Sequence, residues 1–228
     1  MAEPISAAAT AAIQAIQAGD LQELRAILQQ YPELVNARVD GQRTLLHVAT
    51  DWPGHFPSCP ATVTLLLSRG AEPNAPFVGP HSETPLHWAA SSNDVAVLDV
   101  LLDHGADIEA PGAVIGGGTA IADAVAFATW DAARRLVERG ASTNLCQSAA
   151  LGLMDRVESF FALDAAPPPD SEITKAFWCA CHGGQQRAAE YLLARGANPK
   201  WIGYDHLTPL GAAQRAGADA LVAWLQAI

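Results

Sequence analysis

The strongest constraint on the fold of this chain is an internal repeat. A Thr or Lys, an Ala-rich stretch, a Leu-containing stretch and a closing Gly-Ala pair follow one another in the same order in four segments. These segments are residues 44–70, 84–105, 119–140 and 175–196. Repeats of this length are the signature of a solenoid, in which each short unit buries its apolar face against the next unit.

The residue types at the two ends of each segment predict helices. Thr side chains cap helix N-termini, and Pro is tolerated in the first helical turn because the backbone N–H there has no helical partner. The Gly at 70, 105, 140 and 196 suits a helix C-terminus, where the backbone turns to positive φ. Ala pairs such as Ala89-Ala90 let two helices pack closely. We therefore expect two helices in each unit.

Three stretches carry a recognisable motif: TPLHWAA at 84–90, TLLHVAT at 44–50 and TPLGAA at 208–213. They are close to the ankyrin signature T-P-L-H-x-A, and the chain resembles an ankyrin repeat protein of the stand-alone bacterial type. The resemblance implies an all-α solenoid of about seven helix-turn-helix units with finger loops, capped at both ends. It also implies that His47 and His87 tie neighbouring finger loops together.

The expected organisation is a single ankyrin repeat domain over residues 1–228. We place an N-terminal cap at about 5–37, repeats starting near 44, 84, 119, 144 and 175, and a closing unit at 208–228. The starts at 44 and 84 lie 40 residues apart and those at 119 and 144 only 25 apart, against about 33 in a plain ankyrin unit. The extra residues fall in the loops 51–57, 75–83 and 110–118, which predicts custom-built loops there.

In the ankyrin fold, finger loops and first helices form a concave groove, and the resemblance implies that binding occurs in this groove. The candidate ligand-binding residues on the groove face and the flanking loops are Arg43, Asp51, Trp52, His55, His81, Glu83, Trp88, Ser91, Asp123, Trp178, Cys179 and His182. The last three are expected across the groove from the others.

Three acids in this set come from successive repeats: Asp51, Glu83 and Asp123. Neighbouring helices pack roughly 8–10 Å apart, so the carboxylates could converge on one bound molecule beside Trp88. With His55 or His182 they are candidates for general acid–base catalysis. The alternative is that they are solvated acids on an acidic protein.

Charge and composition exclude several classes of function. The chain has 24 acidic and 13 basic side chains, a net charge of −11, which argues against nucleic acid and anionic membrane surfaces as partners. No apolar run reaches ~20 residues and no signal peptide is apparent, so we expect a cytoplasmic protein. Cys179 and Cys181 stand two apart on an expected helix and point to different sides, so we expect no metal and no cofactor.

Two functions remain open. The first is a binding module that recognises a protein partner, possibly a basic one, through the concave groove, with the chain a monomer. The second is a small-molecule-binding protein or an acid–base enzyme of hydrolase, lyase or isomerase type, with its pocket at repeats two to four. A closed pocket formed by the loops 52–56 and 75–83 over Trp88 would favour the second, and an open groove would favour the first.

Overall fold

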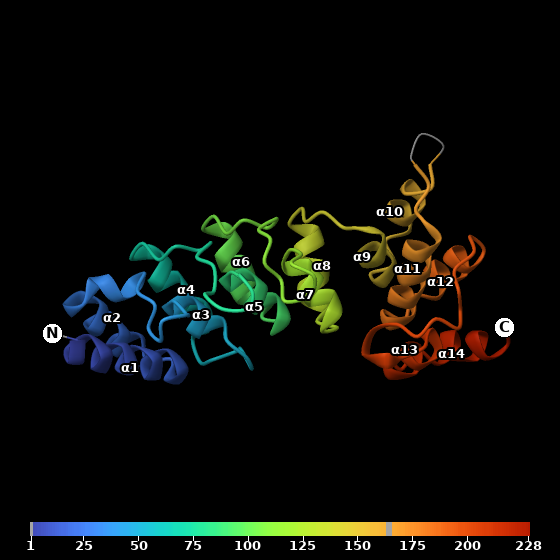
Figure 1. The fold of residues 1–228 in the computed structure, drawn as a ribbon. Helices are drawn as coiled ribbons and strands as arrows, with labels where there is room; N and C mark the ends of the chain where they lie inside the picture. Colours follow the sequence, from blue (N-terminus) through green and yellow to red (C-terminus); the bar gives the residue numbers. More distant parts are fainter. Residues whose placement is uncertain (1, 163–165) are drawn as a thin grey trace. The chain divides into compact units, whose positions relative to one another are not determined.

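The computed structural model describes residues 2–162 and 166–228 (Figure 1). In these residues the chain forms fourteen α-helices and two short 3-10 helices, with no strand. The α-helices follow one another as seven pairs, and partners such as α5 (Pro85–Ser91) and α6 (Val95–Asp103) lie side by side. The predicted all-α fold of about seven helix-turn-helix units is therefore confirmed.

The chain divides into two compact units, Met1–Ala141 and Ser142–Ile228. The remaining helices of the first unit are α1 (Ala2–Ala18), α2 (Leu21–Gln30), η1 (Pro32–Val35), α3 (Leu45–Thr50), α4 (Cys59–Ser68), α7 (Ala120–Ala126) and α8 (Trp130–Glu138). Those of the second unit are α9 (Leu145–Ala150), α10 (Met154–Ser159), α11 (Asp170–His182), α12 (Gln186–Leu193), η2 (Tyr204–His206), α13 (Pro209–Arg215) and α14 (Asp219–Gln226). The single domain over 1–228 stays a prediction.

A single residue with positive φ turns the chain between the two helices of most pairs. Asn93 does so between α5 and α6 with a φ of +56°, and Ala128 between α7 and α8 with a φ of +58°. The next N–H then bonds back into the first helix, as Asp94 N does to Ala89 O at 2.9 Å. In the second unit glycines hold the equivalent places, at 152, 184 and 217.

The predicted helix ends agree with the structure at both termini of most repeats. Thr44 accepts a hydrogen bond from His47 N, and Thr84 precedes Pro85 in the first turn of α5. At the other end, the backbone of Gly70, Gly105, Gly140 and Gly196 has φ between +87° and +100°. Each such glycine relieves a steric cost that a Cβ would impose.

The start of the sixth repeat is a correction. The motif places its first helix at Lys175, but α11 begins five residues earlier at Asp170, with Pro169 as its N-cap. The backbone of Pro169 is extended, so the helix begins at the first residue after the prolines. Asp170 and Glu172 then lie in the first turn, where acidic groups complement the positive end of the helix dipole. The Pro-rich stretch before α11 is described from residue 166 onward.

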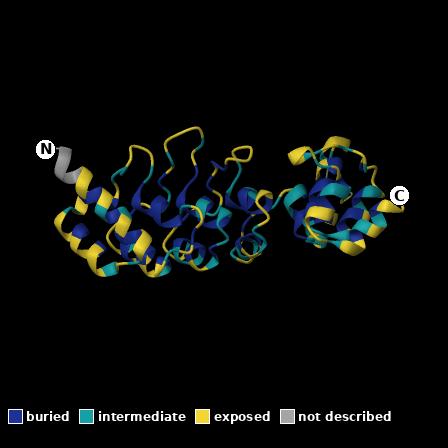
Figure 2. Ribbon diagram, turned by 90° about the horizontal axis from the view of Figure 1, so that it is seen from below, coloured by how far each residue is buried: buried dark blue, intermediate teal, exposed yellow. Residues whose placement is uncertain are grey.

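The core of each unit is made by small and branched apolar residues on facing helices. Ala89 and Ala90 on α5 and Leu98 and Leu101 on α6 have no exposed surface. In Figure 2 the buried residues line the contacts between helices, whereas loops along one edge of the first unit are exposed. Alanines bring the helices close and leucines fill the space between repeats, which leaves the finger loops as the surface available for function.

Candidate functional site

The finger loop 75–83 is a compact hairpin held by its neighbours. Phe77 N donates to Glu83 O at 2.7 Å, and Val78 N donates to Gln42 O at 3.3 Å. The imidazole of His47 takes a hydrogen bond from Thr44 N through Nδ1 and bonds Glu83 O through Nε2 at 3.1 Å. Burial lowers the pKa of His47 to about 4, so the ring is neutral at neutral pH. Each ring nitrogen makes one hydrogen bond, Nδ1 with the backbone of Thr44 and Nε2 with the backbone of Glu83.

The next finger, 110–118, is tied in the same way. Ala113 N donates to Gly118 O at 2.9 Å, and His87 Nε2 bonds Gly118 O at 3.3 Å. A Cβ on Gly112 would overlap the backbone of Ser82, so this finger packs tightly against the preceding one. His47 and His87 therefore have the finger-tying role that the repeat motif implied.

Glu83 and Asp123 form a buried pair of carboxyl groups beneath these two fingers. Their residues are 6 % and 0 % exposed, so neither is a solvated surface acid. Asp123 Oδ2 meets no hydrogen-bond donor, and two carboxyl groups bond each other only when one carries a proton. Burial, together with the hydrogen bond to Glu83 and its charge, raises the pKa of Asp123 to about 8. At neutral pH Asp123 is thus a neutral carboxylic acid.

Hydrogen-bond donors approach the pair from α5 and from the finger 110–118, and an imidazole lies beside it. Trp88 Nε1 donates to Glu83 Oε2 at 2.9 Å, and His81 Nδ1 lies 2.8 Å from the same oxygen. The backbone N–H groups of Val114 and Ile115 donate to Glu83 and Asp123, each at 3.4 Å. The pair therefore connects the finger 110–118 to α5 and α7.

Aromatic rings pack around the same point. Phe77 stacks on His81 with ring centroids 4.6 Å apart and lies 5.6 Å from Trp88. Phe77 was not among the residues singled out from the sequence. Its signal was its place in the long finger 75–83.

Asp51 does not join the acid pair. It is half-buried at the C-terminus of α3, and Arg43 Nη1 donates to its Oδ2 at 2.5 Å. The same guanidinium bonds Asp40 at 2.6 Å. Of the three acids expected to converge, only Glu83 and Asp123 are brought into contact, because Arg43 occupies Asp51 within its own repeat.

The loop after α3 packs on the turn between α5 and α6 and not over Trp88. His55 Nε2 bonds Ser92 O at 3.0 Å and its backbone N donates to Asp94 at 3.3 Å, so the loop rests on the α5–α6 turn. Trp52 is 82 % exposed. Phe77 of the loop 75–83 packs near Trp88, with ring centroids 5.6 Å apart, whereas the loop 51–57 makes these contacts with the α5–α6 turn. Ser91, also half-buried, bonds only Trp88 O within α5, at 3.1 Å.

Trp178, Cys179 and His182 belong to α11 of the second unit. Trp178 and His182, one turn apart, stack with ring centroids 5.3 Å apart, and Trp178 Nε1 donates to Leu207 O at 2.8 Å. Arg215 contacts His182 Nδ1 at 3.4 Å. All three candidate residues are at most 6 % exposed, so they support the finger 200–207 rather than present a surface.

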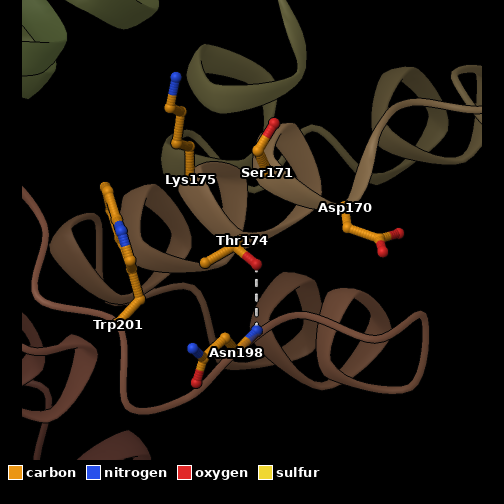
Figure 3. Close-up of a pocket in the computed structure, with 6 residues that line it drawn as sticks. All are labelled: Asp170, Ser171, Thr174, Lys175, Asn198 and Trp201. Atoms are coloured by element: carbon orange, nitrogen blue, oxygen red, sulfur yellow. Dashed lines mark hydrogen bonds between the residues drawn. The ribbon is translucent and has the colours of Figure 1, made fainter.

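The second unit also has an open pocket of about 230 Å³. Its lining comes from the start of α11 and the following finger: Asp170, Ser171, Thr174, Lys175, Asn198 and Trp201 (Figure 3). Thr174 is buried and accepts a hydrogen bond from Asn198 N at 3.1 Å. Lys175 and Ser171 extend from the helix on the side away from Asn198. The pocket is an open feature at the surface of this unit.

Comparison with known proteins now identifies the architecture. Residues 61–147 match the family model of ankyrin repeats in three copies. These residues are ankyrin repeats, and the chain as a whole has the fold of an ankyrin repeat solenoid. The crystal structure of the ankyrin repeat domain of Bcl-3, described as a unique member of the IkappaB protein family, superposes with a TM-score of 0.58. The two are 23 % identical, over 92 % of this chain and 97 % of that one, which shows a shared fold. No curated protein sequence matches the chain.

Other features of these ankyrin repeats bear on the range of possible sites. Across residues 2–162 and 166–228, no group of three or more His, Cys, Asp and Glu side chains is arranged to hold a metal ion. Over the same residues, no helix combines the length and apolar character needed to cross a membrane.

The tips of the ankyrin fingers are the feature that sequence reasoning missed. Val78, Val114 and Ile115 are 49 %, 50 % and 45 % exposed. The signal was present, since FVGP and AVIGGG place branched apolar residues inside loops rich in Gly and Pro. The sequence does not give the exposure of these side chains, because an apolar residue in a loop can equally well be buried beneath that loop.

Proposed function

We propose that this ankyrin repeat solenoid is a protein-binding module and that its first unit takes the partner on the fingers 75–83 and 110–118. The observation that carries the proposal is the apolar surface at the finger tips, formed by Val78, Val114 and Ile115. Exposed apolar side chains that gather on loops held by a rigid scaffold are typical of protein-interaction surfaces.

The two fingers are also ordered before any partner binds. Hairpin hydrogen bonds, the two buried histidines and the Glu83–Asp123 pair hold both loops before any partner arrives. A surface ordered in advance loses little conformational entropy on association, so more of the contact energy is available for affinity.

The charge of the first unit favours a basic partner. Residues 1–141 contain 16 acidic and 7 basic side chains, a net charge of −9, whereas residues 142–228 contain 8 and 6, a net charge of −2. A field of one sign attracts the opposite sign during encounter and raises the association rate more than the affinity. We therefore propose a partner that presents lysines or arginines around an apolar contact.

The acid–base enzyme finds less support. Asp123 has the raised pKa of a general acid, but it is fully buried and no route for a substrate reaches it. Asp51 is taken by Arg43, and His55 bonds the α5–α6 turn. The pair of carboxyl groups is better explained as a connection between fingers.

Co-purification with finger variants tests the proposal. The tagged full-length chain is used to isolate its partner from cells that encode it, and the affinity is then measured for Val114→Ser/Ile115→Ser. We expect at least a tenfold loss, about 1.4 kcal/mol, because the variant removes the apolar centre of the contact.

The matched control is Phe127→Ser. Phe127 is 51 % exposed but lies at the C-terminus of α7, in the turn between the two helices rather than on a finger. Unchanged affinity for Phe127→Ser supports the finger surface. A loss for Phe127→Ser with none for the finger variant would assign binding to the opposite edge of the repeats.

We propose in addition that the protein acts as a monomer in the cytoplasm. Light scattering after size exclusion measures the first property and cell fractionation the second. A dimer mass, or recovery in the membrane or secreted fraction, would contradict them.

A further inference from the structure

Two consecutive backbone amides at the tip of the finger 110–118 each reach a buried acid. Val114 N donates to Glu83 Oε1 and Ile115 N donates to Asp123 Oδ1, both at 3.4 Å. The Cα atoms of consecutive residues are about 3.8 Å apart, so both carboxyl groups lie against the same peptide unit. The finger thus lies over two acids that are 6 % and 0 % exposed.

Three histidines lie around these acids. His81 Nδ1 is 2.8 Å from Glu83 Oε2. His47 bonds the backbone of Glu83, and His87 bonds the backbone of the finger. Burial lowers the pKa of both His47 and His87, so both rings are neutral at neutral pH. The finger 110–118 contains no titratable side chain.

The helix α8 also packs against α7, but its charged side chains have partners of their own. These side chains are Asp131, Arg134, Arg135 and Glu138. Arg135 bonds Asp99 of α6 at 2.8 Å and Glu138 at 2.9 Å, and Arg134 lies 4.0 Å from Asp131. Ionising both buried acids would therefore place two negative charges under one peptide unit, with the arginines of α8 engaged elsewhere.

Closure of the finger and ionisation of Asp123 oppose each other. In an open finger water reaches the acid, and its ordinary pKa of 3.8 applies. In the closed finger burial, the hydrogen bond to Glu83 and its charge raise the pKa to about 8, although the hydrogen bond from Ile115 acts in the other direction. The closed finger binds the proton more tightly, so closure is most favourable below about pH 4 and weakens as pH rises toward about 8.

The finger is also the element that can move at least cost. Glycines with positive φ stand on both sides of its tip, at Gly112, Gly116 and Gly117. Val114 and Ile115 between them are 50 % and 45 % exposed, so opening the finger exposes little additional apolar surface of these two side chains. Moving α5 or α7 instead would break the helix packing of the core.

We propose that the finger 110–118 is a pH-sensitive element, closed while one proton is held by Glu83 and Asp123 and opening more often as that proton is lost. The consequence of this inference rests on the proposed function, since Val114 and Ile115 form the proposed contact surface. The affinity for a partner that binds the closed finger falls with the closed fraction, and therefore falls as pH rises.

Amide hydrogen exchange of the full-length chain without any partner tests the opening. Exchange rates of Ala113 and Ile115 are measured by NMR between pH 5 and pH 8. They are divided by the rates of a peptide of residues 108–120, which removes the pH dependence of the exchange chemistry. We expect their protection to fall by up to about tenfold for each pH unit. Exchange faster than that of Leu101, in the core of α6, shows that the finger opens without unfolding of the repeat.

Two matched variants assign the proton. Asp123→Asn cannot ionise and keeps a donor for Glu83, so the protection of the finger should no longer depend on pH. Asp131→Asn removes an exposed acid of α8 and should keep the pH dependence. If Asp123→Asn does not fold, Glu83→Gln takes its place. Without the charge of Glu83 the pKa of Asp123 is lower, and the protection should fall over a narrower range of pH.

Two results would overturn the inference. One is protection of Ala113 and Ile115 that is constant between pH 5 and pH 8. The other is an unchanged pH dependence in Asp123→Asn, which would assign the titration to His81. Failure of the proposed function would look different: the finger would still open with pH, but Val114→Ser/Ile115→Ser would bind the partner as tightly as the unmodified chain.

Discussion

At the scale of single residues, burial decides the chemical state of the acids. Asp51, at the C-terminus of α3, pairs with Arg43 and stays half-buried. Asp123 has no cation beside it and is fully buried against Glu83. An acid in these surroundings keeps its proton, because ionising it would place a second negative charge beside the first in a medium that screens poorly.

This difference predicts a pH dependence for stability. The pKa of Asp123 rises from 3.8 when unfolded to about 8 when folded, so the folded protein binds this proton more tightly. Its contribution to the free energy of unfolding is fully present below about pH 4 and is lost as pH rises toward about 8. Asp123→Asn, which keeps a donor for Glu83, should flatten this slope in urea unfolding measured between these pH values.

The control for that experiment is Glu33→Gln. It removes an exposed acid from η1 and should keep the slope of the unmodified protein. An equal slope in Asp123→Asn would show that the carboxyl pair does not share a proton.

At the scale of elements, the turns between paired helices carry a conformational cost at some repeats and none at others. Gly152, Gly184 and Gly217 adopt positive φ without a Cβ, whereas Ala128 adopts φ +58° with one. For an L-residue other than Gly, this region costs roughly 1–2 kcal/mol. The α7–α8 turn is therefore less stable than its equivalents in the second unit.

Replacing this alanine should stabilise the protein. We expect Ala128→Gly to raise the free energy of unfolding by about 0.5–1 kcal/mol, because relief of the strained φ exceeds the added flexibility of the unfolded chain. Ala126→Gly, two residues earlier and also exposed but helical, should lower it by about 0.5–1 kcal/mol. Urea midpoints of the two variants measure both effects, and changes of the same sign would contradict the turn argument.

Close approach between repeats makes a different glycine essential. A Cβ on Gly183, at the end of α11, would overlap the carbonyl of Ala150 on α9. Since both sides are backbone, neither can yield without moving a helix, and Gly183→Ala should cost roughly 2 kcal/mol or more. Gly211→Ala, inside α13, meets only ordinary contacts 3.4 Å away and should be neutral or stabilising in the same thermal unfolding measurement.

At the scale of the whole molecule, two compact units share one kind of repeat but differ in charge and in glycine content at their turns. In a repeat protein each unit is stabilised mainly by its immediate neighbours. A destabilising substitution in one repeat is therefore expected to lower the stability of its own unit first.

Hydrogen exchange can measure how far such damage spreads. Leu192→Ala removes a fully buried side chain of α12 and should cost about 2–5 kcal/mol. We expect faster exchange in peptides from Ser142–Ile228 and retained protection in α5 to α8. Leu193→Ala, at the half-buried neighbouring position, should have a smaller effect. Equal acceleration across both units would show that the chain unfolds as one cooperative array.

The sequence by itself determined the repeat, the number of helix pairs, the glycine-terminated helices and the finger-tying role of His47 and His87. The repeat and the helix ends follow from local chemistry: capping hydroxyls, small residues at close approaches, and backbone angles that only certain residues adopt cheaply. The role of His47 and His87 was implied by the resemblance to ankyrin repeats. The start of α11 was misplaced because the prolines before it outweighed the motif.

Only the tertiary structure decided which candidate site residues meet. Asp51, Glu83 and Asp123 were each expected on the groove face of successive repeats, yet Arg43 pairs with the first and burial brings the other two together. It also decided that Trp52 and the finger tips are exposed. Burial and pairing depend on residues distant along the chain, so no local pattern contains them, whereas helix ends and turns are decided within a few neighbouring residues.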